Sequence, residues 1–457
     1  MPNNLLISLM TEAGTSNKGL AKRMRDLAQQ RGITLGTTHV SVQRWRAGSG
    51  IRPGAAALLR DVLSGLLNRQ IALAELGFAH EMESTAPPVR GYPSSPREAL
   101  AALDELAATD PGAMVTGPLS MSGVGLDSIV LTWLLARPDG IPTGAASARR
   151  IGMRDVYAVA TAGEMFMRLD FLYGGGHGHR ALRHYFRHEV LPLLSGSHSD
   201  KVSAALFSAA TEIAQLLAWT AYDAGKHELA HHYLVSTLRL TQVTGDRMAG
   251  SRILSNLSHQ ATFLGHEDQA LKLARAAVEG ARHHSTPRAM SLYTAMEARA
   301  LARAGDGVGA GRAMHEAEKH FERADASVGD DPSWLGYFDA AELQGELAHC
   351  FRDLRQHRNA VDHAQRAVAQ TDPHRYARTL GFCRMVLAQS LLLHGELDEA
   401  LSMATRAIEE GTSLQSARFL GYVTDFQHEI STHASHAGTA DFHDRVRSAL
   451  VRMDDED

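Results

Sequence analysis

The chain has 457 residues, of which 44% are hydrophobic, 6% are aromatic and only 14 are prolines. This length suggests two to four domains or one small module followed by a repeat array, and the recurring Ala, Leu, Arg, Glu and Gln favour an all-α fold. Two cysteines exclude a disulfide framework and a multi-cysteine zinc or iron–sulfur site. We find no signal peptide and no uncharged apolar run of about 18 residues, and therefore expect a cytoplasmic protein.

The charge is unevenly distributed along the chain. The net charge of −5 alone would argue against a nucleic-acid partner. Residues 1–80, however, contain ten Lys and Arg against four Asp and Glu, a net charge of +6, whereas the rest contains 36 against 47, a net charge of −11. A basic N-terminal segment followed by an acidic remainder suggests a polyanion-binding module joined to a region with a different role.

Residues 1–80 contain four short segments in which apolar residues recur at helical spacing. Gly14 ends the first segment, Ser16 offers an N-cap to the second, and Pro53 is well placed to open the fourth. In the third segment, Val42 and Trp45 lie three residues apart, so we expect both to face the core. These helices predict one small domain.

This segment resembles the helix-turn-helix DNA-binding domain of the Cro-repressor and XRE family. The residues behind the resemblance are Leu20-Ala21, Val42, Trp45, Gly48 and Leu73-x-x-Leu76-Gly77. One departure is residues 25–37, which are longer than the usual tight turn. The resemblance implies a recognition helix in the DNA major groove.

The expected DNA contacts follow from that resemblance. It implies that Thr38, His39, Val40 and Arg44 point at base edges, with Ser41 and second-helix residues nearer phosphates. Arg44 is the strongest candidate, because a guanidinium can donate two hydrogen bonds to guanine. The alternative is that Arg44 and Arg46 are solvated or touch only phosphates. The full predicted set is Asn17, Lys18, Thr38, His39, Val40, Ser41, Gln43, Arg44 and Arg46.

Residues 84–96 contain four prolines and no apolar periodicity, which predicts a semi-rigid linker. Residues 97–150 are expected to form a helical, partly irregular connector. Within it, residues 112–150 receive no assigned role.

A repeat of about forty or fifty residues begins near residue 160. Turn glycines recur at Gly225, Gly265, Gly305 and Gly395, each followed five residues later by alanine. Further units fit at Arg355 with Ala360 and, more divergently, at Gly176 with Ala181. The units resemble tetratricopeptide repeats, as in Leu257-Ser258, Gly265, Ala270, Ala274 and Ala277-Val278. We expect a tetratricopeptide-like α-solenoid over residues 151–435, followed by a C-terminal helix and acidic tail over residues 436–457.

A solenoid of this kind presents a concave groove lined by the first helix of each pair. Amides, aromatics and arginines there suit a peptide, an anionic small molecule or a protein effector. The alternative is that Trp219 and Tyr222 are inter-repeat core and that the arginines are solvated. The predicted effector-binding residues are Asp170, Tyr173, Gln215, Trp219, Tyr222, Arg252, Asn256, His259, Arg299, Arg303, His349, Arg352 and Gln389.

The sequence also contains patterns that could suggest chemistry. His227-Glu228-Leu-Ala-His231 matches the zinc-protease pattern H-E-x-x-H, but the repeat frame places a turn and packing helix there and no clear third ligand follows. Cys350 and Cys383 are interpreted as small core residues. We therefore expect neither an enzyme nor a metal or other cofactor, and a zinc metallopeptidase is a remote alternative.

From its first helix to about residue 430, the chain resembles actinobacterial regulators that fuse a helix-turn-helix to tetratricopeptide repeats. The matching elements are Leu169-Asp170-Phe-Leu-Tyr-Gly174-Gly175-Gly176-His177 and Leu217-Ala218-Trp219-x-Ala221-Tyr222-Asp223-Ala224-Gly225. The resemblance implies a dimeric, often negative, regulator of sporulation or specialised metabolism. A protein-interaction scaffold without sequence-specific DNA binding is the main alternative.

Overall fold

The computed structural model describes residues 3–30, 37–47, 51, 53–67, 71, 76, 92–110, 126–140, 151–325 and 331–454. These residues form helices and no β-strand, which confirms the all-α fold class. The chain divides into two compact units, residues 1–88 and residues 89–457.

The first unit is a small helical domain. Its helices are α1 (Asn4–Glu12), α2 (Asn17–Gln30), α3 (His39–Arg46) and α4 (Pro53–Leu67). Gly14, with φ of +58°, lies in the left-handed region just after α1, where glycine is favoured. Val42 and Trp45 are buried as predicted, together with Leu20 and Met24 of α2. One apolar core therefore holds the four helices together.

Polar contacts fix the ends of this domain. The Asn3 side chain donates to the Leu76 carbonyl at 2.8 Å, and Arg25 donates to the Thr37 carbonyl at 2.6 Å. The Arg25 contact spans the long segment between α2 and α3 and so positions the start of α3. The positions proposed above at Gly48, Leu73 and Gly77 lie outside the described residues.

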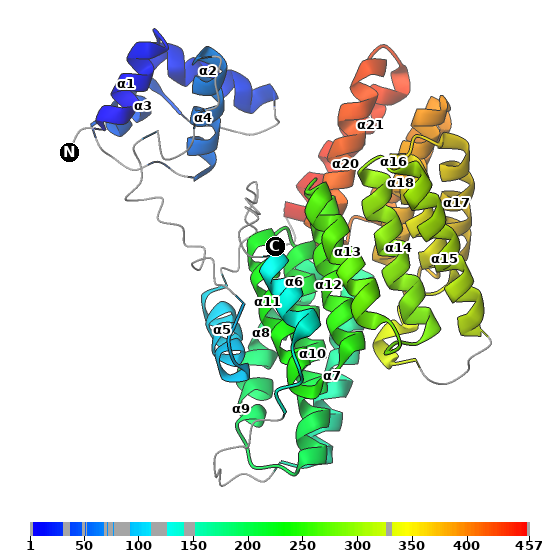
Figure 1. Ribbon diagram of the computed structural model, residues 1–457. Helices are drawn as coiled ribbons and strands as arrows, with labels where there is room; N and C mark the ends of the chain where they lie inside the picture. Colours follow the sequence, from blue (N-terminus) through cyan, green and yellow to red (C-terminus); the bar gives the residue numbers. More distant parts are fainter. Residues whose placement is uncertain are drawn as a thin grey trace. The chain divides into compact units, whose positions relative to one another are not determined.

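The second unit is an array of antiparallel helix pairs (Figure 1). The pairs and the elements between them are α7 (Met153–Tyr173) with α8 (Gly175–Tyr185), η2 (Phe186–Val190), α9 (Leu191–Leu194), α10 (Asp200–Asp223) with α11 (His227–Thr244), α12 (Arg247–Phe263) with α13 (Glu267–Ala281), α14 (Pro287–Arg303) with α15 (Gly307–Asp325), η3 (Ser333–Tyr337), α16 (Ala340–Asp353) with α17 (His357–Gln370), α18 (Ala377–His394) with α19 (Leu397–Glu410), then α20 (Ala417–Ile430), η4 (Ser431–His433) and α21 (Ala437–Asp454).

The turns inside the pairs confirm the repeat frame. The four predicted turn glycines have φ between +77° and +94°, and Arg355, which replaces glycine in its unit, also has a positive φ of +57°. The alanines five residues after these turns are at most 1% exposed, because the paired helices approach closely there. The frame is wrong for the first pair: its turn is at Gly174 rather than Gly176, and Ala181 is exposed.

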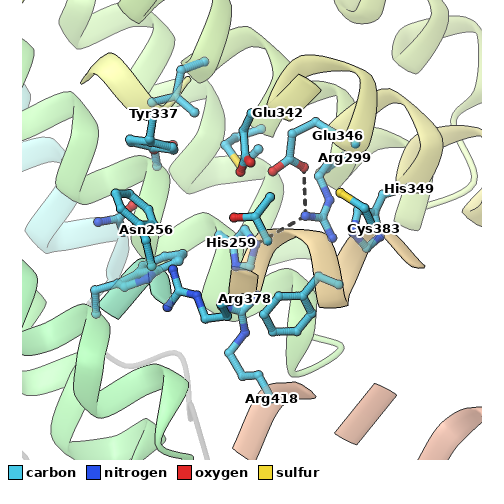
Figure 2. A pocket seen from close by; sticks show the side chains of 18 of the residues that line it. Asn256, His259, Arg299, Tyr337, Glu342, Glu346, His349, Arg378, Cys383 and Arg418 are labelled. Atoms are coloured by element: carbon cyan, nitrogen blue, oxygen red, sulfur yellow. Dashed lines mark hydrogen bonds and ion pairs between the residues drawn. The ribbon is translucent and has the colours of Figure 1, made fainter. Parts of the chain in front are cut away.

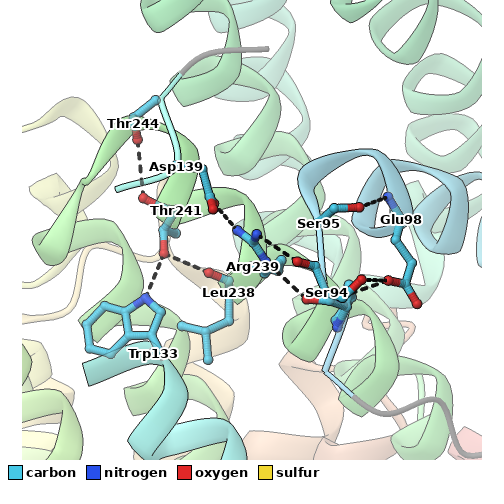
Figure 3. Close-up of polar contacts among 10 residues, drawn as sticks. Ser94, Ser95, Glu98, Trp133, Asp139, Leu238, Arg239, Thr241 and Thr244 are labelled. Atoms are coloured by element: carbon cyan, nitrogen blue, oxygen red, sulfur yellow. Dashed lines mark hydrogen bonds and ion pairs between the residues drawn. The ribbon is translucent and has the colours of Figure 1, made fainter. Parts of the chain in front are cut away.

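The segment predicted as a connector belongs to the array. Its helices α5 (Pro96–Thr109) and α6 (Leu126–Leu135) pack on α11 and α13. Trp133 of α6 is 1% exposed and donates to the Thr241 hydroxyl at 3.0 Å (Figure 3). A Cβ atom at Gly250 or Gly280 would lie within 2.4 Å of the Trp133 ring, so glycine is required beneath it.

The end of the predicted linker is also part of the array. Arg239 of α11 donates to the Pro93 carbonyl at 3.0 Å and pairs with Asp139 (Figure 3). Ser95 caps α5 by accepting from the Glu98 amide. The predicted boundary at residue 96 is therefore a few residues late, and residues 84–91 lie outside the described residues.

Within the described ranges, α10 is the helix long and apolar enough to cross a membrane by length and composition. The sequence search above missed it because it required an uncharged stretch. In the structure, 67% of its apolar window is buried against neighbouring helices.

Trp133→Ala tests the docking of α6. Loss of a buried Trp that contacts two glycine-bearing helices is expected to lower the free energy of unfolding by about 3–5 kcal/mol. Denaturant titration followed by circular dichroism measures this loss. Leu135→Ala, at a side chain that is 79% exposed on the same helix, is the control and should change little. Equal effects of the two substitutions would contradict the docking.

Candidate functional site

The outward face of α3 is polar and basic. Val42 and Trp45 point inward, whereas His39, Gln43 and Arg44 are exposed and Val40 is 44% exposed. Arg44 forms no hydrogen bond or ion pair with any described residue. Its guanidinium is therefore free to bind an external acceptor.

Four other residues of the predicted DNA-binding set, Asn17, Thr38, Ser41 and Arg46, have internal partners. Arg46 donates to the Asn17 side chain at 3.0 Å, which ties α3 to α2. The Ser41 hydroxyl accepts from the Thr38 amide at 3.2 Å at the start of α3. Lys18 is exposed. Asn17, Ser41 and Arg46 thus hold the helix in place. Fewer residues of α3 are therefore available to contact DNA than the sequence predicted.

The array surrounds a cavity of about 120 Å³. Most of its lining comes from the inner helices of successive pairs, as the repeat frame predicted, and the lining elements are α7, α10, α12, α14, η3, α16, α18 and α20, with Ala364 and Ala367 of the outer helix α17. A single water needs about 10–15 Å³ of such space. The cavity therefore accommodates a small molecule.

The cavity wall is completed by contacts between the last helices of the array and the first. Asp223, at the end of α10, is fully buried. Its carboxylate accepts from the Gly175 amide at 2.8 Å and from the Ser416 hydroxyl at 2.9 Å. Arg378 and Arg418 lie 3.6 and 3.5 Å from the same carboxylate. One carboxylate thus joins α8, α10, α18 and α20.

The glycine run between α7 and α8 forms part of this junction. The Gly176 amide donates to the Gln415 carbonyl, and the Gln415 amide donates to the Tyr173 carbonyl, both at 2.8 Å. A Cβ atom at Gly175 would lie 2.5 Å from the Thr220 carbonyl oxygen, and one at Gly176 would lie 2.8 Å from that of Gln415. The run is glycine because two other backbones approach it.

Several charges in the cavity are paired. Arg378 donates to Asp170 at 2.8 Å, and Arg299 donates to Glu346 at 2.9 Å. Burial alone would lower the pKa of Arg378, but the carboxylates of Asp170 and Asp223 outweigh burial and raise it. Arg378 is therefore charged and neutralised within the protein.

Arg418 is held by aromatic rings. Its guanidinium lies 4.6 Å from the ring centre of Tyr222 and 4.8 Å from that of Phe382, with Trp219 and Phe263 within 5.7 Å. Cation–π contacts of this kind stabilise a desolvated cation. Because Arg418 fills this aromatic cage, the cage anchors α20 to the inner helices.

Two ionisable side chains of the cavity wall, Arg252 and Glu342, have no ion-pair partner among the described residues. Arg252 is 8% exposed, stacks 4.1 Å over the Trp334 ring and forms no ion pair with a described residue. Glu342 likewise forms no ion pair with a described residue. Burial, with repulsion from Glu346, raises the pKa of Glu342 to about 8. Glu342 therefore holds a proton at neutral pH.

The histidines and cysteines of the cavity are uncharged. Burial and neighbouring arginines lower the pKa of His259 and of His349 well below the usual value. His259 bridges the Tyr222 hydroxyl at 3.0 Å and Arg299 at 3.3 Å. Burial raises the pKa of the thiol of Cys383, which lines the cavity, and of Cys350, which lies in the core behind it, consistent with small core residues.

The structure brings eight of the thirteen predicted effector residues together in the cavity wall. They are Asp170, Gln215, Trp219, Arg252, Asn256, His259, Arg299 and His349.

The other five predicted effector residues lie elsewhere. Tyr173 is 38% exposed and stacks on His177, and Arg303 is exposed. Arg352 and Gln389 bond to each other at 2.8 Å, and Tyr222 is buried behind the wall. Each of these five residues lies about one helical turn beyond a wall residue on the same helix, and the sequence spacing alone does not show where along the helix the wall ends.

The sequence analysis missed several wall residues, namely Phe171, Tyr337, Glu342, Glu346, Arg378, Phe382, Arg418 and Tyr422. Glu342 and Glu346 lie one turn apart on α16, a spacing that could have identified them as one face. Figure 2 shows these two carboxylates on one side of the pocket and Arg378 and Arg418 on the opposite side.

The H-E-x-x-H pattern lies at the start of α11, as the repeat frame required. His227 packs between the Tyr222 and Phe263 rings, and Glu228 is exposed. In the described part of the chain, no three His, Cys, Asp or Glu side chains are grouped to hold a metal ion.

Comparison with known proteins gives one family match. Residues 6–79 match the model of the SP15 N-terminal domain, so the match is confined to the first unit. No curated protein matches the chain.

Glu342→Gln tests the buried, protonated carboxyl. The folded state keeps the Glu342 proton up to a pKa of about 8, whereas the unfolded state loses it near pH 4.3. The wild type should therefore lose stability as pH rises between these values. The variant, which cannot ionise, should exceed the wild-type Tm by at least about 2 °C at pH 8.5, since ~1 kcal/mol shifts Tm by that amount.

At pH 4.5 the Tm values of the wild type and Glu342→Gln should converge. Glu399→Gln, at an exposed position on α19, is the control and should follow the wild type at both pH values. A pH-independent difference for Glu342→Gln would contradict the assigned protonation state.

Proposed function

We propose that the protein is a sequence-specific DNA-binding transcriptional regulator whose helical array binds an effector in its cavity. The observation behind the proposal is the outward face of α3, where Val40, Gln43 and Arg44 are exposed above a buried Val42–Trp45 face. A short helix of this kind, supported by a second helix across its back, suits the DNA major groove.

The exposed side chains have the chemistry of base recognition. Arg44 can donate two hydrogen bonds to guanine, Gln43 can pair with adenine, and Val40 can contact a thymine methyl group. Residues 1–80, which contain α3, have a net charge of +6, which favours the phosphate backbone. Residues 81–457, at −11, would be repelled by the same backbone.

The cavity supports a sensing role for the second unit. It is lined by aromatic and charged side chains and built from helices that all belong to one array. An effector bound there would act on the inter-helix contacts that surround it. A homodimer would couple such a change to the distance between two α3 helices, which one DNA turn of about 34 Å sets. Repression of development or specialised metabolism is the role that we infer for this regulator.

Arg44→Ala tests the recognition helix. An operator is first selected from genomic fragments with the purified protein, with and without an extract of the native host. The substitution is then expected to weaken binding to that operator by about 1–3 kcal/mol and to relax preference at one base pair, as measured by fluorescence anisotropy. Arg44→Lys keeps the charge but not the two-pronged donor and should lose the preference while retaining more affinity.

Arg312→Ala removes an exposed arginine of α15 and is the control, with no change expected. The logarithm of wild-type affinity should fall linearly with the logarithm of salt concentration. Unchanged affinity and preference in Arg44→Ala would refute the assignment of α3. Failure to select any fragment would favour a protein-interaction scaffold.

A further inference from the structure

The geometry points to a small amphoteric ligand for the cavity, with its anionic group bound by Arg252 and Asn256 and its cationic group bound by Glu342 and Glu346. This inference rests on the proposed function in treating the cavity as the effector site. It narrows the effector from any peptide, small molecule or protein to a compact molecule with one charge of each sign.

The argument begins with which charges are free. Arg378 and Arg299 are neutralised by Asp170 and Glu346, and Arg418 is enclosed by aromatic rings. Among the described wall residues, Arg252 and Glu342 form no ion pair. They also lie more than 4 Å from each other, because no ion pair joins them. A desolvated charge without a partner, such as that of Arg252, is costly. A ligand with one anionic and one cationic group would pair with Arg252 and would allow Glu342 to ionise.

The anionic group has donors on one face of α12. Arg252 and Asn256 lie one helical turn apart, so both side chains reach the same part of the cavity. The Trp334 ring covers one face of the guanidinium and leaves its N–H edge available. The Asn256 amide nitrogen is buried without a partner. Two neighbouring donor groups of this kind fit a carboxylate.

A neighbouring polar group is also unsatisfied. The Gln215 side chain, on α10, is 4% exposed, and its carbonyl oxygen has no hydrogen-bond partner. Buried polar atoms in folded proteins are nearly always hydrogen-bonded. An N–H or O–H group of the ligand would donate a hydrogen bond to this oxygen.

The cationic group has acceptors on α16. Glu342 and Glu346 lie one turn apart, and Figure 2 shows both carboxylates on the same side of the pocket, away from Asn256. Arg299 forms its ion pair with Glu346 and none with Glu342. A ligand ammonium group would compensate Glu342, which would then release its proton to the buffer. The groups that act on Glu342 in the free protein are Tyr337, Asp339, Glu346, Tyr376, Arg299, Arg378 and Cys383.

The experiment uses the full-length protein without DNA, so that its outcome is independent of DNA recognition. The probes are linear ω-amino acids of two to six carbons, each matched by the alkylamine and the alkanoate of equal length. Thermal denaturation at 10 mM probe should give a Tm increase of at least 2 °C for one or more amino acids and less than half of that for both matched compounds. Calorimetry of that amino acid at pH 7 in two buffers of different ionisation enthalpy should show proton release.

Variants connect the response to the two ends of the cavity. Glu342→Gln should abolish proton release and weaken binding at least tenfold. Arg252→Gln should weaken binding to a similar degree while leaving proton release per bound ligand unchanged. Glu399→Gln is the surface control. Glu342→Gln should fold, because it removes a side chain that forms no ion pair. Loss of ligand binding in this variant would therefore not result from unfolding.

Three results would overturn the proposal. One is no Tm change with any amino acid of the series. Another is an equal change with the alkylamine or the alkanoate alone. The third is wild-type binding by Glu342→Gln and Arg252→Gln. If an amino acid binds but no DNA fragment is selected, the proposed ligand class is supported and the proposed regulator function is refuted. If a DNA fragment is selected but no amino acid binds, the regulator function is supported and the ligand class is refuted.

Discussion

The second unit depends on one buried carboxylate, that of Asp223. Without a partner it would be strongly destabilising, and its partners come from segments 241 residues apart: the Gly175 amide on α8 and Ser416 at the start of α20. Satisfying this carboxylate therefore requires the last helices of the array to contact the first. The array thus closes around its cavity, and the buried charges of the cavity wall experience a low dielectric.

That enclosure explains how the wall charges are organised. Buried ion pairs contribute little net stability, yet breaking one leaves an uncompensated charge. Arg378 with Asp170 and Arg299 with Glu346 obey this constraint, whereas Arg252 and Glu342 do not. Unpaired, perturbed groups concentrate at functional sites. We therefore interpret the wall as a paired framework with two positions reserved for a ligand.

The sequence predicted what local geometry determines. Turn glycines, the inward Val42 and Trp45, and the exposed Arg44 follow from helical spacing and from backbone conformation. The glycine run at residues 174–176 could be recognised in the sequence, but the sequence did not show why glycine is needed there. Glycine is needed because the backbone at Gln415 approaches the run, and no sequence periodicity links Gln415 to these residues. Glu342 and Glu346 were missed because charged residues one turn apart usually lie on a solvated face.

Hydrogen exchange at the junction tests the closure of the array most directly. The amides of Gly175, Gly176 and Gln415 all donate across it. Native-state exchange followed by mass spectrometry should show residues 173–177 and 413–417 protected as strongly as the buried helix α10, although both segments lie at helix ends. Asp223→Asn should accelerate both segments together. Rapid exchange of these segments in the wild type, at the rate of exposed turns, would contradict an enclosed array.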